Sequence, residues 1–127
     1  FHKLPIRPGH PLLAAAGPEG QAIFGLPGNP LSVLATATRF AGVALRRKAG
    51  AAQADPPPTL VHVDAPDVPR AGLTWYRPAR LTEPGHAVVI SARGSGDLAA
   101  TAAATGFIET APGAAAVGTV PFRPWAL

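Results

Sequence analysis

Several residue types and patterns that would identify a function are missing from this chain. Its 127 residues contain no cysteine, which excludes a disulfide framework and a thiolate metal site. No apolar run approaches the roughly 20 residues that a membrane-spanning helix needs. The sequence shows no basic start followed by an apolar core, the pattern typical of a signal peptide. We therefore expect a cytoplasmic protein that has no membrane partner.

Methionine is also absent, and the chain begins Phe1-His2-Lys3. Because translation starts with methionine, we expect the chain to be a processed or truncated piece of a longer protein. In contrast, 16 prolines and 14 glycines are spread along the sequence. This abundance indicates many short elements joined by turns rather than a helical bundle.

Charged residues are scarce, at 14 % of the chain, and eleven lysines and arginines outnumber seven acids. Excess positive charge favours anionic partners such as phosphates and oxyanions. Apart from residues 46–48 the basic residues are scattered, so ordinary solubility charge is the alternative and no nucleic-acid partner is predicted. The four histidines lack metal-ligand spacing and the acids are dispersed. We expect no metal site in this chain.

The first fifty residues combine a predicted hairpin with a predicted helix. Apolar runs at 12–16 and 21–26 flank a four-residue Gly-Pro-Glu-Gly loop, a pattern typical of a β-hairpin. Apolar residues then recur at spacings of three and four over 31–48, which predicts a helix. Asn29 is a suitable N-cap before Pro30 at the first helical position, and Gly50 suits a left-handed C-terminal cap.

A linker rich in alanine and proline over 49–58 indicates a domain boundary near residue 54. Beyond it, alternating patterns and turns predict five short strands, at 59–65, 73–81, 86–92, 107–111 and 117–125. One short helix, capped by Asp97 and ended by Gly106, interrupts these strands. The combination predicts a small β-barrel or sandwich.

The stretch Ile-Phe-Gly-Leu-Pro-Gly-Asn-Pro contains the first candidate site. Pro27 and Gly28 turn the chain after a strand, and Asn29 caps the helix that follows. The first amides of that helix, at Leu31 and Ser32, have no intrahelical partner and could bind an oxyanion or phosphate. A helix cap without any ligand is the alternative.

Basic side chains elsewhere could complete such a site. If residues 2–7 are extended, Lys3 and Arg7 share one face, and His10 adds a third donor beyond the Pro-Gly turn. Ser95 offers a hydroxyl within a Gly-Ser-Gly stretch, and Arg77 could clamp an anion through two nitrogens. Solvated surface charges and a flexible turn are the alternatives for these five side chains.

The order of three stretches carries a resemblance to a known family. KLPIRPGHPLL, FGLPGNPLSVL and RGSGDLAATAAATGFI resemble the C-terminal part of the molybdopterin molybdenumtransferases, the MoeA and gephyrin E-domain family. The resemblance covers essentially the whole chain. It implies that residues 1–53 are the C-terminal part of a molybdopterin-binding three-layer α/β domain, and that residues 54–127 are a small all-β barrel domain. Residues 1–50 are then expected to be unstable unless another chain covers them.

The family resemblance implies an enzyme of molybdenum cofactor biosynthesis, which uses Mg²⁺ to insert molybdate into adenylylated molybdopterin with release of AMP. Lys3 and Arg7 match the basic, catalytic positions. The positions implied to bind molybdate or molybdopterin are Pro27, Gly28, Asn29, Pro30, Ser32, Arg77 and Ser95. Ligands for Mg²⁺ are expected upstream of this chain, so the isolated chain is expected to be inactive.

Two positions depart from the family pattern, because Arg7 and His10 stand where lysines are usual. The resemblance also implies a homodimer and contact with molybdoenzymes or other cofactor-biosynthesis proteins. A non-catalytic molybdopterin-binding or protein-scaffold module is the alternative function.

Overall fold

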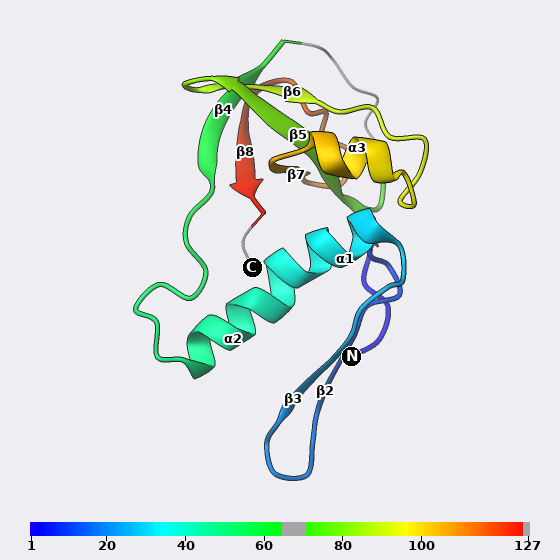
Figure 1. Ribbon diagram of the computed structural model, residues 1–127, viewed down its shortest axis with the longest axis vertical. Coiled ribbons are helices and arrows are strands. Elements are labelled where there is room, and N and C mark those ends of the chain that lie inside the picture. The colour runs from blue at the N-terminus through cyan, green and yellow to red at the C-terminus, as the bar shows by residue number, and fades with distance from the viewer. Residues whose placement is uncertain (65–70, 126–127) are drawn as a thin grey trace.

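The computed structural model describes residues 1–64 and 71–125. The molecule consists of a barrel, a helical rod over residues 30–48 that lies beside it, and a projecting hairpin (Figure 1). The strands are β1 Ile6–Arg7, β2 Leu13–Ala16, β3 Ala22–Gly25, β4 Thr59–Val63, β5 Thr74–Glu83, β6 His86–Val89, β7 Gly106–Thr110 and β8 Gly118–Pro124. The helices are α1 Pro30–Thr36, α2 Gly42–Lys48 and α3 Leu98–Ala103, and a π-helical segment, Ala37–Ala41, joins α1 to α2.

Five strands close into the predicted small barrel. They follow the order β5-β6-β4-β8-β7, and β7 pairs again with β5. The ten-residue β5 is long enough to pair with β7 through its first half and with β6 through its second half. Strands β4 and β6 are parallel, whereas the other four pairs of the ring are antiparallel. Closure removes the exposed edges that an open sheet of these strands would have.

Alternating side chains from the barrel strands, with Ala116 from the loop before β8, fill its interior. The cluster comprises Val61, Val63, Ala79, Ala87, Ile108, Ala116, Val120 and Phe122. At the start of β7 the backbones approach closely, because a Cβ on Gly106 would lie 2.2 Å from the carbonyl oxygen of Arg123. Glycine is therefore required where β7 crosses the end of β8.

The N-terminal segment shares a second core with the barrel. Strand β1 adds in parallel to β5, with Ile6 opposite Thr74. Ile6 and Ala35 of α1 are buried against Tyr76 and Phe107 of the barrel. The predicted boundary near residue 54 and the three-layer α/β domain stay predictions, since the structure shows only this short strand, a hairpin and a helical rod in residues 1–53.

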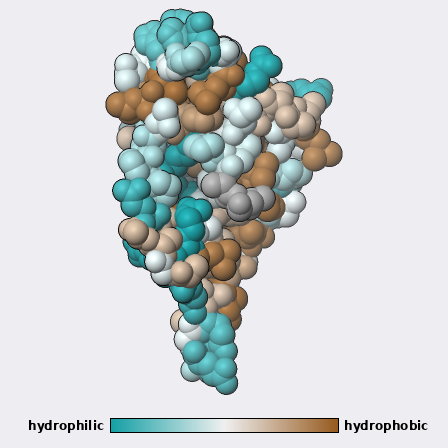
Figure 2. All heavy atoms as spheres, turned by 60° about the vertical axis from the view of Figure 1, so that its left-hand side comes forward, coloured by the Kyte–Doolittle hydropathy of each residue, from teal (hydrophilic) through white to brown (hydrophobic). Residues whose placement is uncertain are grey.

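The predicted hairpin is confirmed as β2 and β3, which extend away from the barrel (Figure 1). Five residues, not the predicted four, lie between the two strands, because Ala16 pairs with Ala22. Most hairpin side chains are exposed. In Figure 2 the hairpin lies at the bottom, with a hydrophilic tip and apolar side chains above it.

The predicted helix over 31–48 is confirmed as a helical run with Pro30 at its first position, but its middle turn is π-helical. The Thr36 hydroxyl donates to the Ser32 carbonyl just before this turn, and such back-bonding perturbs a helix. Asn29 occupies the N-cap position without a side-chain capping bond. Gly50 adopts the predicted left-handed conformation, with φ 77°.

The five strands and the short helix predicted beyond residue 58 are confirmed, although several begin or end at other residues than predicted. Asp97 caps α3 by accepting a hydrogen bond from the Ala100 amide at 3.1 Å. The helix ends at Ala103 rather than at Gly106, because Gly106 already begins β7. The last residue of the strand predicted over 59–65 lies outside the described residues. No helix among the described residues is long and apolar enough to cross a membrane.

Candidate functional site

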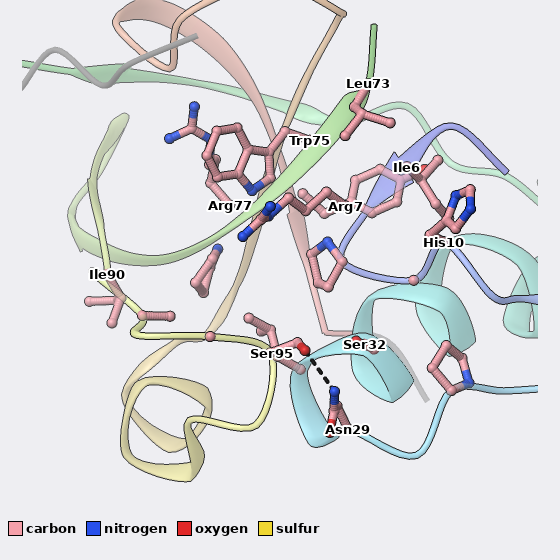
Figure 3. A pocket seen from close by; sticks show the side chains of 18 of the residues that line it. Ile6, Arg7, His10, Asn29, Ser32, Leu73, Trp75, Arg77, Ile90 and Ser95 are labelled. Atoms are coloured by element: carbon pink, nitrogen blue, oxygen red, sulfur yellow. Dashed lines mark hydrogen bonds between the residues drawn. The ribbon is translucent and has the colours of Figure 1, made fainter. Parts of the chain in front are cut away.

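A cleft of about 950 Å³ lies where β1, the start of α1, β5 and the loop before α3 meet (Figure 3). Its walls come from four stretches that are distant in sequence, residues 6–11, 27–32, 73–78 and 89–95. Each stretch contributes at least one side chain that can bind an anion. The fold therefore brings together segments that the sequence analysis treated one at a time.

The first wall is the turn after β1. Gly9 has φ 112°, and a Cβ at this position would lie 2.5 Å from the Cγ2 atom of Thr36. The turn consequently packs directly on α1, which only glycine permits. Arg7 and His10 are exposed on either side of this turn and line the cleft.

Lys3 does not line the cleft. The condition for Lys3 and Arg7 to share a face, an extended chain over residues 2–7, is not met, because only Ile6–Arg7 forms a strand and Lys3 has a left-handed backbone with φ 66°. The alternation that would place Lys3 and Arg7 on one face is therefore broken. The catalytic role assigned to Lys3 stays a prediction.

The second wall is the start of α1, which the Gly-Ser-Gly loop contacts directly. The Asn29 amide nitrogen donates to the Ser95 hydroxyl at 2.8 Å (Figure 3), and the Leu31 backbone amide donates to the Ser95 carbonyl at 3.2 Å. The prediction that the Leu31 amide is open to an anion is therefore wrong. Ser32 lines the cleft and is 3 % exposed.

The third wall is β5, where Trp75 and Arg77 project from the same face of the strand. The guanidinium carbon of Arg77 lies 3.5 Å from the centroid of the Trp75 ring. The guanidinium of Arg7 lies 5.5 Å from the same centroid (Figure 3). Burial lowers the pKa of Arg77, yet an arginine keeps its charge at neutral pH because its ordinary pKa lies far above neutrality.

The fourth wall is the loop that carries Ser95. Asp97 anchors it, since its carboxylate accepts hydrogen bonds from the amides of Ala100 and Arg93. These bonds, the Ala100 bond foremost, lower the pKa of the Asp97 carboxyl. The side chain of Arg93 is exposed at the cleft mouth.

The cleft is electropositive. Arg7, Arg77 and Arg93 line it, and none of its described lining residues is acidic. Burial raises the pKa of Tyr76 to about 12, so its phenol adds no negative charge at neutral pH. Among the described residues, no group of three or more acidic or histidine side chains could hold a metal ion. The chemistry that suits this cleft is the binding of an anion.

The structure brings together six of the nine predicted site residues, Arg7, Pro27, Asn29, Ser32, Arg77 and Ser95. Lys3, Gly28 and Pro30 do not line the cleft. The sequence analysis missed Trp75, although strand alternation in Leu-Thr-Trp-Tyr-Arg-Pro places it on the face of Arg77.

Solved structures with this fold include proteins of molybdenum cofactor biosynthesis. A MoeA protein of Pyrococcus horikoshii matches 99 % of this chain, with a TM-score of 0.80 and 23 % identity, and 32 % of that protein is covered. A second structure, of MoeA from Pyrococcus horikoshii OT3, matches 95 % with a TM-score of 0.72 and 26 % identity, and 31 % of it is covered. A molybdenum cofactor biosynthesis protein of Pyrococcus furiosus matches 95 % of this chain with a TM-score of 0.70 and 21 % identity, and 41 % of that protein is covered. The chain thus spans well under half of these proteins.

In sequence, 41 residues are 54 % identical to a molybdopterin molybdenumtransferase of Synechococcus elongatus, over 32 % of this chain and 10 % of that protein. No family model matches the chain. The resemblance to molybdopterin molybdenumtransferases that the sequence indicated is confirmed by these matches, and it extends to one part of those longer proteins.

Proposed function

We propose, from the resemblance of this chain to one part of the MoeA-type proteins, that it supplies one wall of the site at which molybdate is inserted into adenylylated molybdopterin with release of AMP. The observation that carries the proposal is the electropositive cleft, where Arg7, Arg77 and the linked pair Asn29–Ser95 converge from four distant segments. Both molybdate and the phosphates of the nucleotide are anions, so one cleft of this charge suits both substrates.

The side chains of the cleft have separate tasks in this proposal. The two guanidiniums bind oxyanions through pairs of parallel N–H groups. The Ser95 hydroxyl accepts from Asn29, which leaves its own proton for an oxyanion. Pro8 and Gly9 are buried and hold the Arg7 turn on α1, so the position of Arg7 is defined by the fold.

Mg²⁺ does not fit the donors of this cleft. Magnesium prefers carboxylate and phosphate oxygens, whereas the charged side chains here are cationic. Any ligands for Mg²⁺ are therefore proposed to lie upstream, in a part of the protein that this chain does not contain. The activity is proposed for the longer protein, a homodimer in the cytoplasm, and not for this chain alone.

The test is AMP release by the native gene product, purified from its own cells and supplied with adenylylated molybdopterin and molybdate. Arg77→Ala is expected to lower the rate by about a hundredfold, the effect of removing a preorganised donor to an anionic centre. Arg80→Ala on the same strand is the matched control, because Arg80 is exposed and does not line the cleft. Equal rates for the two variants would contradict the proposal.

A binding or scaffold module, without catalysis, is the second candidate, and one observation favours it. Three apolar side chains on β4, β5 and β6 are exposed to solvent: Leu60 is 64 % exposed, Leu81 46 % and Val88 41 %. Apolar surface of this kind suits contact with another protein, such as a molybdoenzyme or another cofactor-biosynthesis protein. In that case Leu81→Ser would reduce partner capture while Arg77→Ala would not.

A further inference from the structure

We infer, building on the proposed function, that Trp75 is a positioning residue that holds the guanidiniums of Arg7 and Arg77 in one cluster, so that both act on the same anion. Neither the family resemblance nor the relatives' names assign a role to this position. The three side chains come from the two parallel strands β1 and β5.

The strand register determines this cluster. Arg7 lies directly opposite Trp75 in the β1–β5 pair, and Arg77 follows Trp75 by two residues on the same face of β5. The indole centroid lies 3.5 Å from the guanidinium carbon of Arg77 and 5.5 Å from that of Arg7. Both distances are within the roughly 6 Å range of a cation–π interaction.

The two guanidiniums carry like charges and repel each other, and the indole offsets this repulsion. Their separation is within the ionic screening length, about 10 Å at 0.1 M salt, so salt does not cancel the repulsion. The negative face of an indole attracts cations more strongly than any other aromatic side chain does. Trp75 therefore stabilises a concentration of positive charge that an aliphatic residue would not.

Holding Arg7 in place also lowers the entropic cost of binding. Arg7 is exposed, and a free arginine side chain loses many rotamers when it binds an anion. The contact with Trp75, 5.5 Å from the ring centroid, restricts these rotamers beforehand. The predicted ligand contact is thus guanidinium to oxyanion, with the indole behind the cations rather than against a ring of the ligand.

Titration of the protein with inorganic phosphate and with molybdate, followed by calorimetry, tests the inference. Trp75→Leu is expected to weaken both affinities by about tenfold, and Trp75→Phe by less, because benzene attracts cations more weakly than indole. Leu60→Ala on the barrel surface is the control and is expected to leave both affinities unchanged. Equal affinities for wild type and Trp75→Leu would overturn the inference.

Fluorescence supplies a measurement that does not depend on how well Trp75→Leu folds. The chain has two tryptophans, and Trp125 donates to the Ala104 carbonyl and packs on Phe107, away from the arginines. In Trp125→Phe, the emission of Trp75 is expected to change as phosphate saturates the protein, because the bound anion alters the electric field of the guanidiniums beside the indole. In Trp75→Phe, the emission of Trp125 is expected to stay constant. Constant Trp75 emission at saturation would overturn the inference.

The two proposals fail in different ways. If Trp75→Leu weakens phosphate binding but the native gene product releases no AMP, the proposed function is wrong and the positioning role stands. If AMP release depends on Arg77 while Trp75→Leu binds phosphate as wild type does, the positioning role is wrong and the proposed function stands.

Discussion

The barrel and the N-terminal segment differ in how far they bury their apolar side chains. The barrel closes on itself and buries its own cluster, with Phe122 and Ile108 almost fully excluded from solvent. In the N-terminal segment, α2 has no buried residue, and Leu13 and Ile23 of the hairpin are 37 % and 48 % exposed. The barrel is therefore stabilised by apolar side chains that it buries itself, whereas the hairpin and α2 bury few apolar side chains within this chain. The cleft lies between these regions and depends on both.

The largest predicted effect separates the two regions directly. Phe122→Ala is expected to lower the free energy of unfolding by about 4 kcal/mol, because it removes a fully buried ring from the barrel core. Leu45→Ala in α2 is expected to change it by less than about 0.5 kcal/mol, because Leu45 is 69 % exposed. Urea denaturation of both variants measures the difference. A comparable loss for Leu45→Ala would show that α2 is buried in solution, and would contradict the difference between the two regions.

A smaller effect on the free energy of unfolding is expected from the ion pairs that join the helical rod to the barrel. Arg39 of the π-helical turn contacts Asp55 and Glu109, and Arg123 of β8 contacts the same two acids. Glu109→Gln is expected to lower the free energy of unfolding by about 1 kcal/mol, since these partly exposed pairs are screened by solvent. Urea denaturation at low salt and at 1 M salt measures this loss, which should shrink at high salt.

Glu19→Gln is the matched control for this network, because Glu19 is exposed in the hairpin loop and its hydrogen bond to Gln21 is local. It is expected to leave the free energy of unfolding unchanged. An equal loss from both variants would mean that the network does not join the helical rod to the barrel.

The smallest effect concerns pH. The pKa of Asp97 is lowered in the folded protein by the amides of Ala100 and Arg93, so its carboxylate adds stability above its ordinary pKa of about 4. That contribution is lost as the pH falls from there through the lowered value. Thermal melts of wild type and Asp97→Ala are expected to differ at pH 7 and to converge as the pH falls through the lowered pKa of Asp97. A difference that grows on acidification would contradict this assignment.

Local patterns in the sequence predicted the elements of both regions well. Alternation identified all five barrel strands, Asp97 marked the start of α3, and Pro30 marked the start of the helical run. These signals are local, since they depend on side-chain periodicity and on the hydrogen bonds of a helix end. The earlier end of α3 reflects strand pairing that already begins at Gly106. The longer hairpin loop reflects strand pairing that stops at Ala16 and Ala22, which leaves Gln21 in the loop.

The arrangement of the cleft depended on information that is not local. No periodicity predicts that β1 pairs with β5 across more than sixty residues, and this pairing is what sets Arg7 beside Trp75. The Asn29 side chain was predicted as a helix cap, but it contacts Ser95, which is distant in sequence. Lys3 was grouped with Arg7 on the assumption of an extended chain, and a single left-handed residue removes that grouping.

A titration of the ¹⁵N-labelled protein with molybdate, followed residue by residue through its amide resonances, tests directly whether this cleft binds an oxyanion. We expect the resonances of Arg7, Ser32, Arg77 and Ser95 to shift together with one affinity, while those of the hairpin and α2 stay in place. An equal concentration of a neutral solute such as glycerol should move none of them. Molybdate shifts that are absent from the cleft, or that follow exposed lysines and arginines elsewhere, would contradict the assignment of this cleft as an oxyanion site.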